Sequence, residues 1–220
     1  MKIKLVIFDL DGTLINAYRA VYESVNYVMK RFGYPRIDSA TIKRTVGWGE
    51  RHLIRAFIGE EGLRKVHKAY RTHHKKELPE SSKTLPGARR LLRYLQKNQY
   101  QMAVATNRPA ETSQILLKHL KLFDYFDYVL CGDKVDNPKP HPEILNKVLV
   151  KCDCRPNEAL YVGDMTIDVE AGKRARVKTV AVPTGSSYLN EIKALKPYRI
   201  VKNVYEVADV LRAMGNGQLI

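Results

Sequence analysis

Two carboxylates with a single residue between them lie near the start of the chain, directly after a short apolar run. Asp9 and Asp11 follow Leu5–Phe8 and precede Gly12, which frees the backbone to turn and to present N–H groups to an anion. Side chains alternate along a strand, so both carboxylates should point the same way, with Leu10 pointing into the core. Like charges this close repel, and a divalent cation such as Mg²⁺, which prefers oxygen ligands, would resolve the conflict. The alternative is a strand end followed by an ordinary Asp-Gly turn.

A second pair of acids has a spacing that would suit one cation. Asp164 follows an expected strand at Ala159–Val162, and Asp168 lies in the first turn of the helix expected next. The spacing can place both carboxylates near one cation, and negative charge is favoured at a helix N-terminus. Capping of that helix is the alternative role for these two residues.

Two further positions offer groups that bind phosphoryl oxygens. Thr106 and Asn107 follow the expected strand at Met102–Ala105 and supply a hydroxyl and an amide, although this pair is also typical of a helix N-cap. Lys139 lies in a segment with three prolines, residues 137–142, which stiffens the loop and fixes where the ammonium can go. An isolated lysine would otherwise be a solvated surface residue.

The elements that must position these residues alternate between strand and helix from residue 86 onward. Repeated β-α units predict a Rossmann-like α/β fold, in which helices cover both faces of a parallel sheet through right-handed crossovers. The expected strands lie at residues 5–8, 102–105, 128–131, 159–162 and 177–182, with a closing helix at 204–214.

Residues 17–78 have helical periodicity throughout and contain no convincing strand. Apolar stripes indicate four helices, interrupted near Gly33 and at the Gly47–Gly49 turn. A segment rich in Pro, Ser and Thr, residues 78–87, reads as the exit linker. We therefore expect a core domain made of residues 1–15 and 85–220, and an inserted all-helical cap domain of residues 16–84.

The positive charge of the chain is its one unusual bulk property. The 220 residues include 38 Lys and Arg against 23 Asp and Glu, a formal net charge of +15. Nucleic acid is a possible partner of such a chain. However, the basic residues are dispersed, dense only at Arg64–Lys76, and no RNA- or DNA-binding motif lies nearby. A solvated basic face that steers an anionic substrate is the favoured interpretation, and a nucleic-acid partner is disfavoured.

Cellular location is expected to be the cytosol. No apolar run approaches the roughly 18 residues of a membrane span, and the N-terminus does not read as a secretory signal. The three cysteines agree, because Cys152 and Cys154 are too close for an easy disulfide and Cys131 has no obvious mate. No membrane partner is expected, and the oligomeric state is open.

Taken together, the four chemical motifs resemble the haloacid dehalogenase (HAD) superfamily. Asp9–Thr13 is similar to its first motif, Thr106 to its second, Lys139 to its third and Gly163–Asp168 to its fourth. The helical insertion after the first motif resembles the family's C1-type cap. The resemblance covers essentially residues 3–182, and the set of four motifs is highly specific.

This resemblance implies roles for the acidic residues. Asp9 would attack phosphorus and become an aspartyl phosphate, while Asp11 would protonate the leaving oxygen and later accept a proton from water. Mg²⁺ would bind the Asp9 side chain, the Asp11 carbonyl and Asp164, with Asp168 bound directly or through water. These roles make Mg²⁺ the expected cofactor.

The resemblance also implies how the phosphoryl group is held. Lys139 would offset the negative charge of the nucleophile and the phosphoryl group. Thr106 and the backbone N–H groups of Leu10 to Gly12 would hold the phosphoryl oxygens. In the family the region around the Gly47–Gly49 turn reaches over the active site, so Trp48 and Arg51 are candidates for substrate contact. A packing role for Trp48 and a surface role for Arg51 are the alternatives.

Subclass features favour a phosphatase similar to phosphoglycolate phosphatase. Asp11 argues against halide displacement, and the first histidine, His52, comes too late for the early cap histidine of β-phosphoglucomutases. The chain has Asn16-Ala17 where many phosphoglycolate-type phosphatases have Asp-Ser, a departure that falls in the hinge, leaves the chemistry intact and does not point to one substrate. We expect Mg²⁺-dependent hydrolysis of a small anionic phosphomonoester; a phosphomutase, a pyrophosphatase or a basic nucleic-acid-binding module are the alternatives.

Overall fold

Four consecutive apolar residues form a central strand of a parallel six-stranded sheet. The computed structural model describes residues 2–216. Strand β1 (Leu5–Phe8) pairs with β4 (Gln101–Thr106) on one side and with β6 (Ala159–Gly163) on the other. The strand order is β5-β4-β1-β6-β7-β8, and the outer strands are β5 (Tyr128–Cys131), β7 (Lys178–Ala181) and β8 (Arg199–Ile200). The predicted parallel α/β fold is confirmed.

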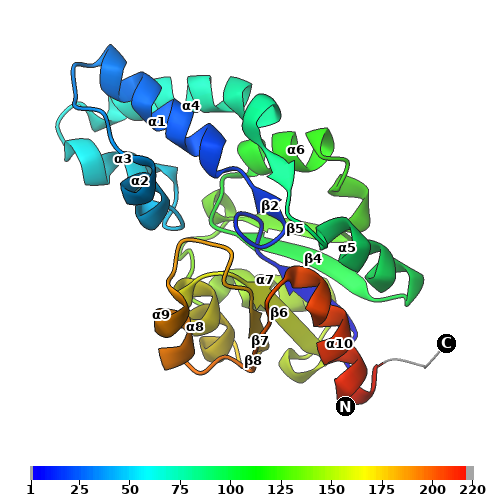
Figure 1. Cartoon of the computed structure of the whole chain (residues 1–220). Helices are drawn as coiled ribbons and strands as arrows, with labels where there is room; N and C mark the ends of the chain where they lie inside the picture. Colours follow the sequence, from blue (N-terminus) through cyan, green and yellow to red (C-terminus); the bar gives the residue numbers. More distant parts are fainter. Residues whose placement is uncertain (1, 217–220) are drawn as a thin grey trace.

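Helices cover both faces of this sheet, as Figure 1 shows. Val6 and Phe8 of β1 contribute to the hydrophobic cluster on one face, whereas Leu5 and Ile7 contribute to the cluster on the other. All four side chains are fully buried, which explains why β1 lacks the polar alternation of a half-exposed strand. The first face is covered by α5 (Ala88–Lys97), α6 (Ala110–His119) and α10 (Val207–Leu211), and the second by α7 (Glu143–Lys151) and, at its edge, α8 (Thr166–Arg174).

The inserted helices form a segment with its own hydrophobic cluster at one end of the sheet (Figure 1). We call α1–α4 the helical segment; its members are α1 (Tyr18–Arg31), α2 (Ser39–Thr45), α3 (Glu50–Ile58) and α4 (Leu63–Ser81). The chain enters and leaves it through two short antiparallel strands, β2 (Ile15–Asn16) and β3 (Lys83–Thr84). Division of the chain into a core domain and a cap at residues 16 and 84 stays a prediction.

The structure corrects the predicted linker. Helix α4 continues to Ser81 and includes Pro79, so the first residues of the expected linker at 78–87 are helical. Leu78 is fully buried in the main core cluster, and this packing holds the last turn of the helix in place despite the proline.

Short elements near the C-terminus were not predicted. Helix α9 (Leu189–Ala194) and β8 are too short to show a full hydrophobic period. The expected closing helix is divided into a 3₁₀ turn, α10 and a π-helical stretch: η4 (Val204–Glu206), α10 and η5 (Arg212–Asn216). Three further 3₁₀ turns are η1 (Phe123–Tyr125), η2 (Gly132–Lys134) and η3 (Pro156–Glu158).

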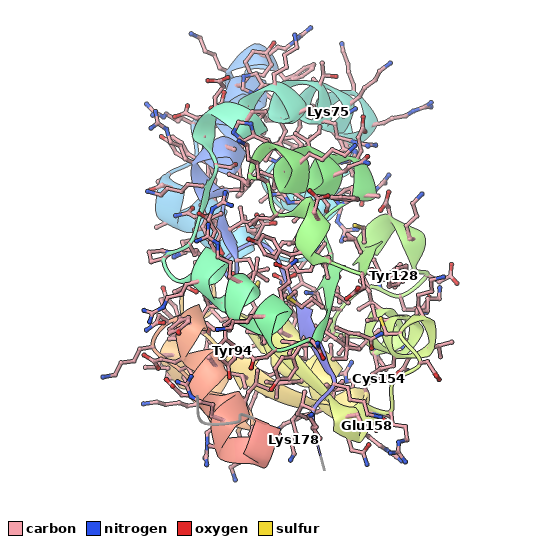
Figure 2. The ribbon with its side chains drawn as sticks, turned by 90° about the vertical axis from the view of Figure 1, so that its right-hand side faces the viewer. Lys75, Tyr94, Tyr128, Cys154, Glu158 and Lys178 are labelled. Carbon is pink, nitrogen blue, oxygen red and sulfur yellow. The ribbon has the colours of Figure 1, made fainter. Side chains whose placement is uncertain are left out.

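The cysteines are free, and two labelled lysines lie far apart. Lys75 on α4 and Lys178 on β7 lie at opposite ends of the molecule (Figure 2). Cys131, Cys152 and Cys154 are buried and form no disulfide. Within residues 2–216, no helix combines the length and the apolar character needed to cross a membrane.

Candidate active site

The carboxyl ends of three neighbouring strands bring the predicted motifs together. Asp9 directly follows β1, Thr106 ends β4, and Asp164 directly follows β6. Because β1 lies between β4 and β6 in a parallel sheet, these three ends meet at one edge. The sheet therefore builds the site from three segments that are far apart in sequence.

Three buried carboxylates form a cluster at this edge. One oxygen from each of Asp9, Asp164 and Asp168 lies within 4.8 Å of the others. Asp168 Oδ2 also accepts the backbone N–H groups of Asp164, at 3.1 Å, and Met165, at 2.9 Å. The capping alternative is therefore observed, and the other oxygen, Oδ1, accepts from the Tyr161 hydroxyl at 2.8 Å and from Lys139. Metal binding by Asp168 stays a prediction.

One carboxylate oxygen of Asp164 is buried and has no hydrogen-bond partner among the described residues. This oxygen is Oδ2, whereas Oδ1 accepts a hydrogen bond of 2.9 Å from Thr13 Oγ1. Burial, reinforced by the charges of Asp168 and Asp9, raises the pKa of Asp164 well above its ordinary value. An unpaired oxygen in a group of three carboxylates fits a hard divalent cation, which prefers oxygen ligands.

The backbone next to Asp164 is built to keep this carboxylate in place. A Cβ atom on Gly185 would lie 1.4 Å from Asp164 Oδ2, and one on Gly12 would lie 2.4 Å from the same oxygen. Gly12 also has a φ of +82°, a conformation that favours glycine. Two glycines are therefore required where two loops close around the carboxylate.

Lys139 supplies the positive charge of the cluster. Its ammonium donates to Asp9 Oδ1 at 2.7 Å, to Asp168 Oδ1 at 2.8 Å and to the Tyr161 hydroxyl at 2.9 Å. Burial alone would lower the pKa of Lys139, but the two carboxylates raise it above its ordinary value. The lysine is 2% exposed, which places a fixed cation beside the predicted nucleophile.

The pKa of Asp9 is also raised, but in this case burial is the main cause. Burial raises the pKa of Asp9 to about 6, although the Lys139 cation partly offsets this effect. Asp9 is 7% exposed and lines the pocket described below. It therefore combines a fixed position with access to a ligand.

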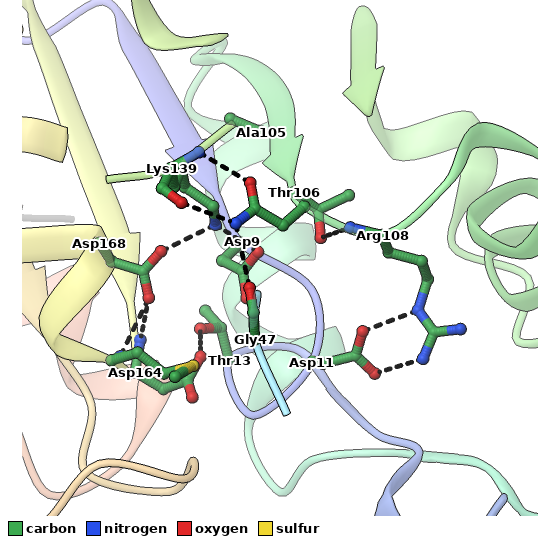
Figure 3. Close-up of polar contacts among 12 residues, drawn as sticks. Asp9, Asp11, Thr13, Gly47, Ala105, Thr106, Arg108, Lys139, Asp164 and Asp168 are labelled. Atoms are coloured by element: carbon green, nitrogen blue, oxygen red, sulfur yellow. Dashed lines mark hydrogen bonds and ion pairs between the residues drawn. The ribbon is translucent and has the colours of Figure 1, made fainter. Parts of the chain in front are cut away.

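The structure corrects the predicted direction of Asp11. Its carboxylate does not join the acidic cluster; it turns toward Arg108, as Figure 3 shows. Arg108 Nε donates to Asp11 Oδ2 at 2.7 Å, and Arg108 Nη2 donates to Oδ1 at 3.0 Å. The alternation argument failed because β1 ends at Phe8, so Asp11 lies in the following turn rather than in a strand. The expected metal contact of the Asp11 carbonyl stays a prediction.

The side chains of Thr106 and Asn107 are hydrogen-bonded to backbone groups. Thr106 Oγ1 accepts the backbone N–H of Arg108 at 3.3 Å. The Asn107 amide donates to the carbonyls of Gly47 and Lys139, each at 3.0 Å, and its oxygen accepts the Lys139 N–H at 2.9 Å. Both residues line the pocket, so phosphate binding by them stays a prediction beside an observed structural role.

Of the backbone groups expected to hold phosphate, one is already engaged. The Gly12 N–H donates to the Ile15 carbonyl at 2.8 Å. The Leu10 side chain is fully buried, as predicted from the strand end, and its carbonyl accepts from Leu14 at 2.9 Å. Phosphate binding by the Gly12 N–H would therefore require this turn to change.

A small pocket lies between the sheet edge and the helical segment. Its volume is about 60 Å³. From the core it is lined by Asp9, Asp11, Thr106, Asn107, Arg108, Lys139, Met165, Ile167 and Asp168. From the helical segment it is lined by Tyr18, Val21, Val46, Gly47, Gly49, Glu50, Leu53, Tyr70 and His74. A ligand in this pocket would contact both parts of the chain.

Neither Trp48 nor Arg51 is among the described residues that line this pocket. Trp48 is 46% exposed, and the Arg51 side chain is 67% exposed and lies 3.6 Å from Glu60. Their neighbour Glu50 lines the pocket instead, and its Oε1 accepts from the Thr112 hydroxyl at 3.3 Å. Contact of Trp48 and Arg51 with substrate thus finds no support in this arrangement.

Sequence reasoning missed the basic and aromatic part of the pocket. Arg108 immediately follows Thr106 and Asn107, so its proximity to the site was available from the sequence, but its partner Asp11 was not. Tyr70 and His74 lie one turn apart on α4, and their rings stack with centroids 4.9 Å apart. They face the site only because of how α4 docks on the core.

Comparison with known proteins identifies the family. The model described as "Haloacid dehalogenase-like hydrolase" matches residues 6–182, and the chain belongs to this family. Phosphoglycolate phosphatase 1 of Pseudomonas aeruginosa is 30% identical, over 93% of this chain and 78% of that protein. Pyrophosphatase PpaX of Bacillus cereus is 32% identical, over 97% of this chain and 99% of that protein.

A similar solved structure has the same fold. A predicted phosphoglycolate phosphatase from Haemophilus somnus 129pt superposes with a TM-score of 0.90 at 24% identity, covering 96% of this chain and 98% of that one. The fold, the site and the family together make the protein an enzyme, a HAD-like phosphatase of the phosphoric monoester hydrolase class.

Proposed function

We propose that the enzyme is a Mg²⁺-dependent phosphatase that hydrolyses a small phosphomonoester through a phosphorylated Asp9. The observation that carries this proposal is the arrangement around Asp9. Its buried carboxylate lines the pocket, is hydrogen-bonded to Lys139 at 2.7 Å, and lies in one cluster with Asp164 and Asp168. A nucleophile, a fixed cation and a set of oxygen ligands thus share one edge of the sheet.

In this mechanism an Asp9 oxygen attacks phosphorus, and the bond between phosphorus and the ester oxygen breaks. Asp11 gives a proton to the departing oxygen, then accepts a proton from the water that hydrolyses the aspartyl phosphate. Lys139 holds Asp9 in position and offsets part of the negative charge. Thr106 and Asn107 shape the neighbouring loop, and their place in the pocket lining supports a role in holding phosphoryl oxygens.

The acidic cluster would hold the metal ion. Asp9, Asp164 and Asp168 would be its side-chain ligands, together with the Asp11 carbonyl. When bound, Mg²⁺ would stabilise negative charge on the phosphoryl group. The unpaired Oδ2 of Asp164 supports this assignment.

The helical segment would act as a cap over the site. Nine residues of this segment and of its connecting loops line the pocket, and the Asn107 amide reaches the carbonyl of Gly47. The two-stranded ribbon of β2 and β3 marks the place where the cap would join the core at residues 16 and 84. Closure of such a cap would exclude water from the reaction.

The substrate we propose is a small anionic phosphorylated metabolite such as phosphoglycolate. Relatives that cover most of this chain are phosphoglycolate phosphatases, and a pocket of about 60 Å³ suits a small leaving group. Pyrophosphate is the second candidate, because the Bacillus cereus relative at 32% identity is a pyrophosphatase. A phosphomutase would return the phosphoryl group to its product and release no phosphate.

Phosphate release tests this function. Wild type and Asp9→Asn should be assayed with phosphoglycolate, pyrophosphate and sugar phosphates, with and without Mg²⁺. Mg²⁺-dependent release that disappears in Asp9→Asn is the expected result. Absence of release from all of these substrates would overturn the hydrolase mechanism. Isomerised phosphorylated products without release would instead assign the chain to the mutases.

A further inference from the structure

Arg108 is a buried cation that faces the pocket and binds the predicted proton donor. It is 8% exposed and donates to both oxygens of Asp11, at 2.7 and 3.0 Å. Its Nη1 lies 3.2 Å from Nε2 of His74 on α4. A guanidinium has five N–H donors, so three are used here and two remain for another acceptor.

His74 holds this guanidinium from the helical segment. His74 is fully buried, and its Nδ1 lies 3.1 Å from the Ser24 hydroxyl. Because Arg108 can only donate, His74 Nε2 must accept, and the histidine is therefore neutral with its proton on Nδ1. The ring also stacks on Tyr70, which fixes its plane. Arg108 is thus oriented from one side by His74 and from the other by Asp11.

The proposed chemistry conflicts with this arrangement of Asp11. A proton donor must reach the leaving oxygen, but the bidentate contact with the guanidinium occupies both carboxylate oxygens of Asp11. If Asp11 moved away alone, Arg108 would stay buried and lose both of its hydrogen bonds to a carboxylate, which is unfavourable. An anion that takes the place of Asp11 would restore these bonds.

We propose that Arg108, oriented by His74, is a subsite for a second negative group on the substrate, and that this group replaces Asp11 on the guanidinium. The proposal rests on the phosphatase function above and narrows its substrate class. Among the described residues that line the pocket, the other cation is the ammonium of Lys139, which is committed to Asp9 and Asp168. Arg108 is therefore the cation left to receive the group that the ester oxygen carries.

The chemistry of this exchange selects a kind of phosphomonoester. The leaving alcohol should carry a carboxylate close to its oxygen, because Arg108 already binds the residue expected to protonate that oxygen. Such a group satisfies the buried guanidinium and frees Asp11 in one event. A phosphomonoester of the same size with a neutral leaving alcohol leaves Asp11 on Arg108 and should react slowly.

The direct test compares two esters of matched size, phosphoglycolate and 2-hydroxyethyl phosphate. Wild type should prefer phosphoglycolate in kcat/KM. Arg108→Met, which removes the charge and retains most of the side-chain volume, should lower that preference by roughly 100-fold. Exposed Arg64→Met on α4 is the matched control and should keep the preference. An equal loss on both esters in Arg108→Met would overturn the proposal.

His74 is tested as a positioning residue. His74→Phe removes the acceptor for Arg108 but retains a ring against Tyr70, whereas His74→Gln retains an acceptor. His74→Phe should raise KM for phosphoglycolate more than for 2-hydroxyethyl phosphate, and His74→Gln should restore part of the difference. A KM change of the same size for both esters would show that His74 only supports the fold.

A binding measurement tests the Arg108 subsite independently of the proposed phosphatase activity. Calorimetry with 3-phosphonopropionate and with propylphosphonate compares a charged and a neutral ligand that cannot be hydrolysed. Wild type should bind the carboxylate-bearing ligand more tightly, and Arg108→Met should lose that difference. This outcome would support the subsite even if phosphate release failed. Equal affinity of wild type for the two ligands would overturn the subsite while leaving the phosphatase function intact.

Discussion

The side-chain amide of Asn107 lies 3.0 Å from the carbonyl oxygen of Gly47, sixty residues earlier in the chain, and donates a hydrogen bond to it. The same side chain binds both backbone polar groups of Lys139. One residue therefore joins three parts of the site: the strand end at β4, the loop that carries the lysine, and the turn between α2 and α3. The orientation of Lys139 and the position of the helical segment should both depend on Asn107.

Asn107→Ala should lower kcat/KM by roughly 10- to 100-fold, because Lys139 and the Gly47 turn would lose their common partner. Asn107→Asp retains the acceptor for the Lys139 N–H but loses both donors. It should therefore separate the effect of the accepted hydrogen bond from the effect of the two donated ones. Steady-state kinetics measures the effect, with exposed Asn146→Ala on α7 as the control. Unchanged kinetics in Asn107→Ala would show that the turn and the lysine are held without this amide.

Lys139→Met should abolish most of the activity, by roughly 100- to 1,000-fold in kcat. Its ammonium is the cation closest to Asp9 and Asp168, at 2.7 and 2.8 Å. Without it, the carboxylates repel one another and the pKa of Asp9 should rise further, so less of the nucleophile is ionised. Exposed Lys97→Met on α5 controls for loss of a charge. Retention of more than a tenth of wild-type kcat would contradict the role of Lys139.

Mg²⁺ should stabilise the folded protein through the acidic cluster. A ligand that binds only the native state adds about 2.7 kcal/mol at a concentration of 100 times its Kd. Wild type should therefore show a rise in Tm on Mg²⁺ titration that EDTA reverses. Asp164→Asn should lose this rise, because it keeps an acceptor for Thr13 but removes the charge at the unpaired oxygen.

The metal-free forms provide the control for that experiment. Burial and neighbouring carboxylates raise the pKa of Asp164 well above its ordinary value, so a neutral amide there removes an unfavourable charge. Metal-free Asp164→Asn should be at least as stable as metal-free wild type. Exposed Asp124→Asn should keep the full Mg²⁺ response. A Tm rise in Asp164→Asn equal to that of wild type would place the metal elsewhere.

Much of the core could be predicted because its signals are local. β5 covers the predicted residues 128–131, and β4 and β6 each extend the predicted strand by one or two residues. Each is an apolar run limited by turn residues, and strands buried on both faces need no other pattern. Asp9 and Asp164 were expected at strand ends and Asp168 in the first turn of the next helix, and the structure brings the three carboxylates together.

Contacts across the pocket could not be predicted from such signals. Asp11 pairs with Arg108, which is 97 residues away in sequence. The turn after β1 brings the Asp11 carboxylate to the loop after β4, and that contact is not encoded in either local sequence. Glu50 and His74 enter the site through the docking angle of the helical segment, which periodicity does not encode. Trp48 was chosen for its size and flanking glycines, but it is its neighbours in that turn that line the pocket.

Acid should destabilise the protein through His74. Burial and, to a lesser extent, the Arg108 cation hold the pKa of His74 well below its ordinary value. The unfolded residue titrates near pH 6.5, so below that value the unfolded state binds more protons than the native state, and the free energy of unfolding falls. One proton corresponds to a slope of about 1.4 kcal/mol per pH unit.

His74→Gln should therefore lose less stability than wild type between about pH 7.5 and about pH 5.5, measured by urea unfolding. Asp9 acts in the opposite direction: its pKa is raised to about 6, so it stabilises the native state as the pH falls through that value. That contribution is present in both proteins and cancels in the comparison. Parallel pH profiles would mean that His74 is already protonated in the native state, and Nε2 would then be unable to accept from Arg108.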